Sequence, residues 1–164
     1  MNAVVEMDFD AQYNRQKDWK YNGKKQYEEA ERRFQKVYAA HLRAPVYFNG
    51  PWHRMDFTVL NEPDGRITHF VEFKSCRNKP AKMQPIKIDK LVNAKLLRDT
   101  MSIRCFFVFK YSTEDDSVYH FLNVQHISDY DLSRVAWCDA YGTANGNPVI
   151  YVPNTKLRPV HLHD

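Results

Sequence analysis

The stretch THFVEFKSCRNK, from Thr68 to Lys79, decides how the rest of the chain is interpreted. In its first half, polar side chains alternate with apolar ones, which is typical of a β-strand. Glu72 and Lys74 lie two residues apart in it. Side chains two residues apart in a strand point to the same face, roughly 6.5 to 7 Å from each other. The stretch therefore predicts a strand with a carboxylate and an amine on one face and with Val71 and Phe73 on the other.

The preceding segment WHRMDFTVL, residues 52–60, predicts the partner of this strand. Its apolar residues alternate with polar ones, and they are Met55, Phe57 and Val59. The NEPDG stretch between the two segments contains Asp followed by Gly, a common turn pair, so we expect a β-hairpin. If the apolar faces of both strands point to one core, Asp56 lies on the face that carries Glu72 and Lys74.

A helix is predicted before the hairpin, between Gly23 and Pro45. Its apolar positions recur with the helical period, and they are Tyr27, Ala30, Phe34, Val37, Tyr38, His41 and Leu42. Glu31 lies within this apolar stripe, although other charged residues of the segment fall on the opposite face. A carboxylate turned toward the core needs a partner, because an isolated buried charge costs several kcal/mol or more. A divalent metal ion held by Asp56 and Glu72 would be such a partner.

The segments after the hairpin predict an α/β domain on a mixed sheet. A loop rich in Lys, Arg and Pro leads to a second helix, about 88–99, whose expected apolar stripe is Ile88, Leu91, Val92 and Leu96. The near-continuous apolar run CFFVFKY predicts a strand that is covered on both faces. Two more strands, VYHFLNV and VIYVP, and a short basic tail that we expect to be frayed complete the chain.

The expected element order is α, β, β, α, β, β. The sequence contains no repeat and no linker rich in Pro, Gly or Ser. We therefore expect one domain over residues 1–164, with a core of about 23–124 and an unassigned C-terminal extension of about 128–164. The chain has 164 residues, of which 43% are hydrophobic, and this is enough to build a core.

Charge and cysteine content bound the partners and the compartment. The net charge of +4 is mild and favours a polyanionic partner. Three widely spaced cysteines, Cys76, Cys105 and Cys138, form neither a disulfide framework nor a CxxC zinc pair, which indicates a reducing compartment. The N-terminal MNAVVEMDFD has acids where a signal peptide has bases, and no apolar run is long enough to span a membrane. We expect a soluble cytoplasmic protein without a membrane partner.

The expected cluster of carboxylates determines the chemistry. Oxygen ligands without thiols or paired imidazoles suit a hard cation such as Mg²⁺ or Mn²⁺. Such an ion polarises a phosphoryl oxygen and lowers the pKa of a bound water. The compact ammonium of Lys74 would stabilise the phosphorane or orient the water. The pattern therefore predicts metal-dependent hydrolysis of phosphodiesters, with no small-molecule organic cofactor.

These residues also resemble a known family. Asp56, followed by fifteen residues and then by Glu72-Phe-Lys74, resembles the D…(D/E)xK core of the PD-(D/E)XK nuclease superfamily. The segment AERRFQKVYAAHL is similar to the first helix of archaeal-type Holliday-junction resolvases. The resemblance implies a restriction-endonuclease-like core, Mg²⁺ or Mn²⁺ held by Glu31, Asp56 and Glu72, and Lys74 as the catalytic lysine. Met55 stands where the superfamily name has proline, a position that varies within it.

The basic segment that follows Lys74 is a candidate contact for a nucleic acid. Its cations are Arg77, Lys79, Lys82 and Lys87, and beside a nuclease site they predict contacts to DNA phosphates, whereas a solvated loop is the alternative. The expected substrate is DNA, cut by an endonuclease, an exonuclease or a junction resolvase, and the sequence leaves a homodimer open. A compact core with an unassigned tail also resembles small phage-encoded proteins. The alternative function is a catalytically silent nuclease-like module that binds nucleic acid or protein.

Overall fold

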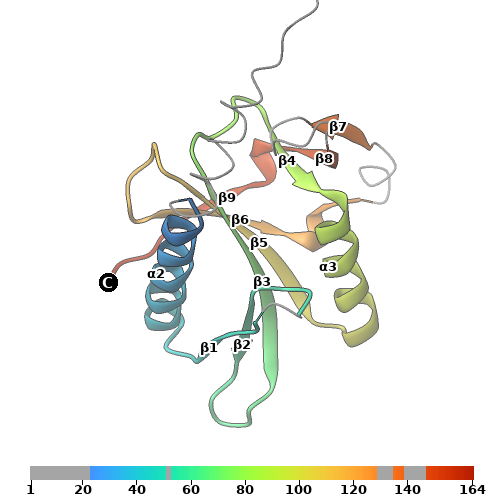
Figure 1. Ribbon diagram of the computed structural model, residues 1–164. Coiled ribbons are helices and arrows are strands. Elements are labelled where there is room, and N and C mark those ends of the chain that lie inside the picture. The colour runs from blue at the N-terminus through green and yellow to red at the C-terminus, as the bar shows by residue number, and fades with distance from the viewer. Residues whose placement is uncertain (1–22, 51–52, 129–134, 139–146) are drawn as a thin grey trace, which may run out of the picture.

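The computed structural model describes residues 23–50, 53–128, 135–138 and 147–164 of the chain (Figure 1). Trp52, at the start of the predicted hairpin, lies outside the described residues. The helices and longer strands are α2 (Lys24–Leu42), β1 (Val46–Phe48), β2 (Phe57–Leu60), β3 (Ile67–Cys76), β4 (Met83–Lys87), α3 (Ile88–Met101), β5 (Arg104–Tyr111), β6 (Val118–Asn123), β7 (Ala136–Cys138), β8 (Asn147–Pro153) and β9 (Arg158–His161).

The main sheet has six strands in the order β1-β2-β3-β5-β6-β9. Only its central pair, β3 and β5, is parallel, and the connection between these two strands contains α3. A parallel pair needs such a crossover, and its strands are covered on both faces. This explains the continuous apolar run of β5, in which Cys105, Phe107, Val108, Phe109 and Tyr111 are buried. The mixed α/β class and the helix-flanked central sheet are confirmed, and they agree with the restriction-endonuclease-like core that the resemblance implies.

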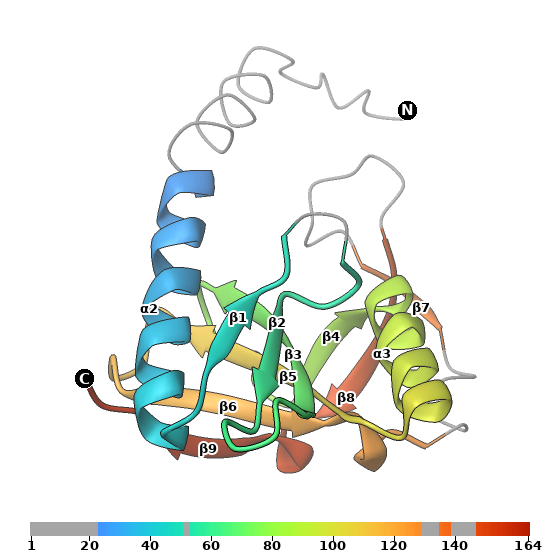
Figure 2. The same ribbon diagram turned by 90° about the horizontal axis from the view of Figure 1, so that it is seen from below.

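The two helices cover opposite faces of this sheet (Figures 1 and 2). Helix α2 buries Phe34, Val37 and Tyr38 against one face, as its 3.6-residue pattern predicts. Helix α3 buries Leu91 and Ala94 in the other core cluster. Both strands of the central pair contribute side chains to both cores. The end of β3 lies between the two helices.

The predicted hairpin is confirmed, but its first strand is shorter than expected. Strand β2 begins at Phe57 and pairs antiparallel with β3, and Gly65 adopts a φ of +66° in the turn. Residues 53–56 form bends instead of a strand. The expectation that Met55 shares a face with Phe57 is wrong, because these bends place Met55 in the core under α3 while Phe57 packs under α2.

Half of the apolar stripe expected for helix α3 packs in the core, since Leu91 is buried and Ile88 is partly buried there. Val92 and Leu96, expected in its apolar stripe, are 51% and 45% exposed. His41 of α2 is likewise exposed instead of packed. In α3, Ala94 is buried although it was not in the expected stripe, because the packing partner, and not the helical period alone, decides which residues of the helix are covered.

Two segments expected to be irregular form strands. Strand β4 lies in the predicted basic loop and pairs with β8, which together with β7 makes a second, three-stranded sheet. Strand β9 lies in the tail expected to be frayed and pairs with β6 at the edge of the main sheet. Both pairings join segments far apart in sequence, which local patterns do not report. Among the described residues, no helix has the length and apolarity needed to cross a membrane.

Candidate active site

The site forms where β2 has ended and β3 continues. The last residue of β3 that pairs with β2 is Val71, opposite Phe57. Beyond it, side chains take over the backbone groups of Phe73: its N–H donates to Asp56 Oδ2 at 2.8 Å, and its carbonyl accepts from Tyr27 Oη at 2.7 Å. These two hydrogen bonds fix Asp56 and the first turn of α2 beside the strand that carries Glu72 and Lys74.

Glu72 is the most deeply buried charged group of the site. Its side chain has no exposed surface, and on its strand face it lies between Phe70, which is buried in the core under α3, and Lys74, which is half-buried. Two ammonium groups lie against one of its oxygens, Oε1: Lys74 Nζ at 2.8 Å and Lys90 Nζ at 3.0 Å. The other oxygen, Oε2, is buried and accepts no hydrogen bond from any residue that the structure describes. A buried carboxylate oxygen in this state is costly unless a cation reaches it.

Glu31 of helix α2 lies within electrostatic reach of this cluster. Burial and the charge of Asp56 raise the pKa of Glu31 to about 7. Burial and the charge of Glu72 raise the pKa of Asp56 to about 6. Burial alone would lower the pKa of Lys74, but its contact with Glu72 raises it above the usual value. The charges of Asp56, Glu72 and Lys74 all act on Glu31, so these residues, which come from a helix, a bend and a strand, lie within electrostatic reach of one another.

The donors of this cluster fit a hard divalent cation. Carboxylate oxygens are the ligands that Mg²⁺ and Mn²⁺ prefer, and Glu72 Oε2 has no other partner among the described residues. The carboxylates are not arranged as a ready-made cage, since no three His, Cys, Asp or Glu side chains in the described part of the chain form a metal-binding group. The ammonium groups of Lys74 and Lys90 supply the positive charge at Glu72 instead.

Lys90 is the member of this cluster that the sequence did not reveal. It lies in the first turn of α3, where the helix dipole disfavours a cation. A lysine in the first turn of a helix, next to Asp89, is therefore an unusual feature, and it is the signal that could have marked Lys90 as a candidate site residue. Its contact with Glu72 also depends on how α3 crosses the sheet, and this is set by the parallel pairing of β3 with β5.

The four predicted DNA contacts are spread over the connection from β3 to α3. Arg77 and Lys82 are exposed, and Lys79 is exposed with its Nζ 3.7 Å from Glu114 Oε1. Lys87 is half-buried at the end of β4 and precedes the first residue of α3. These residues therefore do not form one continuous loop, because β4 fixes the second half of the segment in the small sheet.

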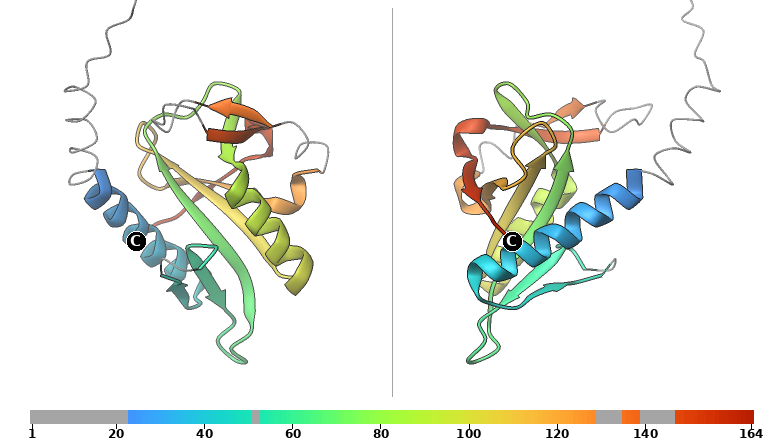
Figure 3. Two further views of the ribbon diagram at one scale, coloured as in Figure 1. Left: turned by 45° about the vertical axis from the view of Figure 1, so that its right-hand side comes forward. Right: turned by 90° about the vertical axis from the view of Figure 1, so that its left-hand side faces the viewer.

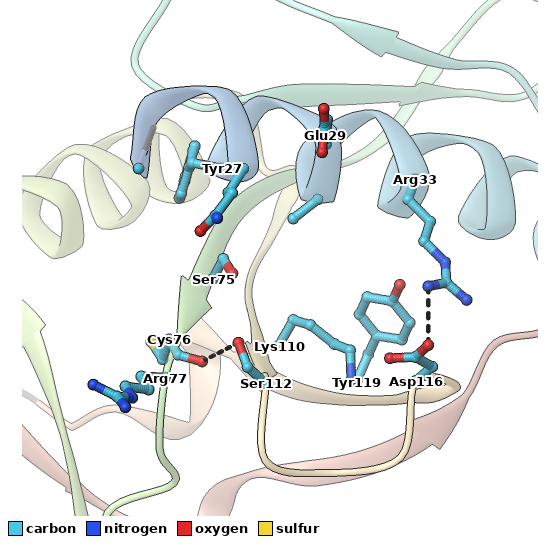
Figure 4. A pocket seen from close by; sticks show the side chains of 13 residues that line it. Tyr27, Glu29, Arg33, Ser75, Cys76, Arg77, Lys110, Ser112, Asp116 and Tyr119 are labelled. Carbon is cyan, nitrogen blue, oxygen red and sulfur yellow. Dashed lines mark hydrogen bonds and ion pairs between the residues drawn. The ribbon is translucent and has the colours of Figure 1, made fainter. Parts of the chain in front are cut away.

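Arg77 also lines a pocket of about 820 Å³ under the N-terminal half of α2 (Figure 4). Lys110 and Arg33 line the same pocket. Arg33 is paired with Asp116 at 3.3 Å, and Lys110 donates to the carbonyl of Asp115 at 2.8 Å. The acidic turn that holds these cations reduces the attraction of the pocket for an anion.

Two other polar residues of the chain are structural. His69 is half-buried, and its Nε2 lies 2.9 Å from Tyr38 Oη of α2. Gln84 is 3% exposed, accepts a hydrogen bond of 2.6 Å from Tyr111 Oη and donates one to the carbonyl of Pro85.

The comparisons with known proteins are sparse. No family model matches the chain, and no curated protein matches it. Among solved structures, the chain is similar to Hjc, a Holliday junction resolvase from the archaeal hyperthermophile Archaeoglobus fulgidus, with a TM-score of 0.41 and 11% sequence identity. The alignment covers 75% of this chain and 88% of that one.

Proposed function

We propose that the chain is a Mg²⁺- or Mn²⁺-dependent nuclease that hydrolyses phosphodiester bonds in DNA. The observation that carries this proposal is the buried Glu72 in contact with Lys74, with Asp56 and Glu31 within electrostatic reach, on the part of β3 that no longer pairs with β2. Three carboxylates crowded at one place destabilise each other unless a cation is shared among them. Their spacing in the sequence, which resembles the PD-(D/E)XK pattern, supports the same function.

Each residue has a role that follows from its surroundings. Glu72 and Asp56 would hold the cation, with Glu31 completing the set from α2. A bound divalent cation polarises the phosphoryl oxygen and lowers the pKa of a water molecule. Lys74 lies on the same strand face as Glu72, so its ammonium can bind a phosphate oxygen and offset the charge that develops there. The hydrogen bond from Phe73 N–H holds Asp56 in place during this chemistry.

A catalytically silent nuclease-like module is the second candidate. It is favoured by the pairing of Glu72 with two ammonium groups, which neutralises the carboxylate without a metal. In such a protein the charged cluster would be a structural network, and binding of nucleic acid or protein would involve no turnover.

Incubation of the purified protein with Mg²⁺ or Mn²⁺ and a panel of linear, nicked, branched and single-stranded DNA tests the proposal. We expect wild type to cleave at least one substrate, and Lys74→Ala to lose cleavage while keeping its fold and its metal affinity. Glu72→Ala should lose both cleavage and metal binding. The exposed Lys36→Ala on α2 is the matched control and should cleave like wild type. Equal cleavage by wild type and Lys74→Ala, or no cleavage by wild type, would contradict the proposal.

A further inference from the structure

Lys90 reaches the buried carboxylate of Glu72 from a different element than Lys74 does. Lys74 lies on β3 itself, whereas Lys90 belongs to α3, which covers the sheet face opposite α2 (Figure 3). The side chain of Lys90 is 32% exposed while Glu72 is fully buried. The ammonium of Lys90 thus lies at the boundary between solvent and the carboxylate cluster, where a substrate would approach.

The second ammonium is more than Glu72 needs as a counter-ion. Lys74 alone neutralises the carboxylate at 2.8 Å. Because Lys90 Nζ contacts the same oxygen, the two like charges are separated by no more than the sum of two hydrogen-bond lengths. The repulsion between them is offset by the neighbouring carboxylate of Asp56, on which the charges of Lys74 and Lys90 both act.

Charge balance indicates which further group would fit. Glu31, Asp56 and Glu72 carry three negative charges when ionised, and Lys74 and Lys90 carry two positive ones. A divalent cation among the carboxylates leaves one net positive charge, which matches the single negative charge of a phosphodiester. Without Lys90 the loaded site would be neutral and would have no net attraction for the scissile phosphate.

We propose that Lys90 is a second catalytic lysine, whose ammonium leaves Glu72 when the carboxylate takes up a divalent cation and then contacts an oxygen of the scissile phosphate. This inference rests on the proposed nuclease function. Lys90 transfers no proton in this role. It offsets the charge on the phosphoryl oxygens while the bond from the water oxygen to phosphorus forms and the bond to the leaving nucleotide oxygen breaks.

The test compares Lys90→Gln, Lys90→Arg and the control Lys36→Gln with wild type in two measurements. In calorimetric titration with Mn²⁺ and no DNA, Lys90→Gln should bind the metal at least as tightly as wild type, because a competing ammonium has been removed. In single-turnover cleavage at saturating Mn²⁺, its rate should fall by about 10² to 10³-fold. Lys90→Arg keeps the charge and should recover part of the rate, and Lys36→Gln should match wild type.

Three results would overturn the inference. Wild-type rates for Lys90→Gln at saturating Mn²⁺, or a loss of Mn²⁺ binding in that variant, would make Lys90 a structural anchor of Glu72 while leaving the proposed function intact. A wild-type protein that cuts no DNA would overturn both.

If Lys90→Gln does not fold, a crystal structure of wild type with Ca²⁺ and uncleaved DNA decides the same question. Lys90 Nζ is expected within about 3 Å of a phosphate oxygen. Lys90 Nζ still in contact with Glu72 would overturn the inference.

Discussion

Glu31 shows how a single residue can carry a functional signal in a sequence. A charged residue in the apolar stripe of an amphipathic helix conflicts with the pattern around it, and such conflicts are expected at functional sites. The structure places Glu31 close enough to Asp56 for the charge of that carboxylate to raise its pKa. The conflict in the stripe therefore points to a residue on which the charges of Asp56 and Lys74 act, and its role as a metal ligand stays a prediction. Lys90, on a helix whose packing was not predictable, gave no comparable signal.

Neutralising Glu31 separates a functional role from a structural one. Glu31→Gln keeps the size of the side chain and removes one of three crowded charges, so the free energy of unfolding without metal should stay the same or rise slightly. The apparent affinity for Mn²⁺ should fall by about tenfold or more. Calorimetric titration and thermal denaturation measure the two quantities on the same sample. Unchanged Mn²⁺ affinity together with a higher melting temperature would assign Glu31 to packing alone.

The burial of His69 should make the free energy of unfolding depend on pH. Burial, with the charge of Arg104, lowers the pKa of His69 from 6.5 to about 4 in the folded protein. Between these values the unfolded chain binds a proton on His69 that the folded protein does not, so the free energy of unfolding falls as the pH drops from about 6.5 to about 4. The loss from this residue is at most about 3 kcal/mol.

Comparison with His69→Gln isolates this contribution, because the other titrating groups are common to both proteins. Urea unfolding at several pH values gives the free energy of unfolding of both proteins. The difference in this free energy between wild type and the variant should narrow or change sign below pH 6. A gap that is constant from pH 4 to pH 8 would mean that His69 keeps an ordinary pKa in the fold.

At the scale of elements, α3 gives a direct check of the packing. Leu91 is fully buried and Leu96 is 45% exposed on the same helix. Leu91→Ala should lower the free energy of unfolding by about 2 to 5 kcal/mol, because it leaves a cavity in the core. Leu96→Ala, the matched control, should change it by no more than about 0.5 kcal/mol. Chemical denaturation of both variants measures the difference, and equal losses would mean that Leu91 and Leu96 are buried alike, as the full stripe expected from the sequence requires.

The elements that could be predicted are those with strong local patterns. Alternation and the Asp-Gly turn indicated the β2–β3 hairpin, and helical periodicity indicated α2 with its buried face. Strands β4 and β9 were missed because their partners, β8 and β6, lie far away in sequence. The side taken by Met55 was missed because bends at residues 53–56 break the alternation that its letters suggest.

The same division holds for the candidate site. Asp56, Glu72 and Lys74 could be placed together because they sit in or next to one hairpin, where a period of two residues fixes the faces. The position of Asp56 nevertheless depends on a hydrogen bond to Phe73 N–H and not on a strand. The contact of Lys90 with Glu72 could not be predicted, because it depends on the crossover through α3, which no local sequence pattern describes.

At the scale of the whole molecule, the net charge of +4 is too small to bind DNA strongly by itself, so the proposed function requires local cations at the DNA contact. If Arg77 and Lys82 contact phosphates, Arg77→Ala with Lys82→Ala should weaken DNA binding for all sequences alike. The slope of log affinity against log salt concentration should fall by about one for each phosphate that the variant no longer neutralises. Fluorescence anisotropy in Ca²⁺ at several salt concentrations measures this slope. A double variant with the slope of wild type would place the DNA elsewhere on the surface.

The central claim is that Glu31, Asp56 and Glu72 hold one divalent cation at the end of β3. Anomalous diffraction from crystals soaked in Mn²⁺ tests it most directly, because the signal locates the ion without reference to activity. We predict a peak about 2 Å from carboxylate oxygens of Asp56 and Glu72, with Lys90 Nζ no longer in contact with Glu72. Crystals that take up Mn²⁺ at other places, while Lys74 and Lys90 both remain on Glu72 Oε1, would contradict the account.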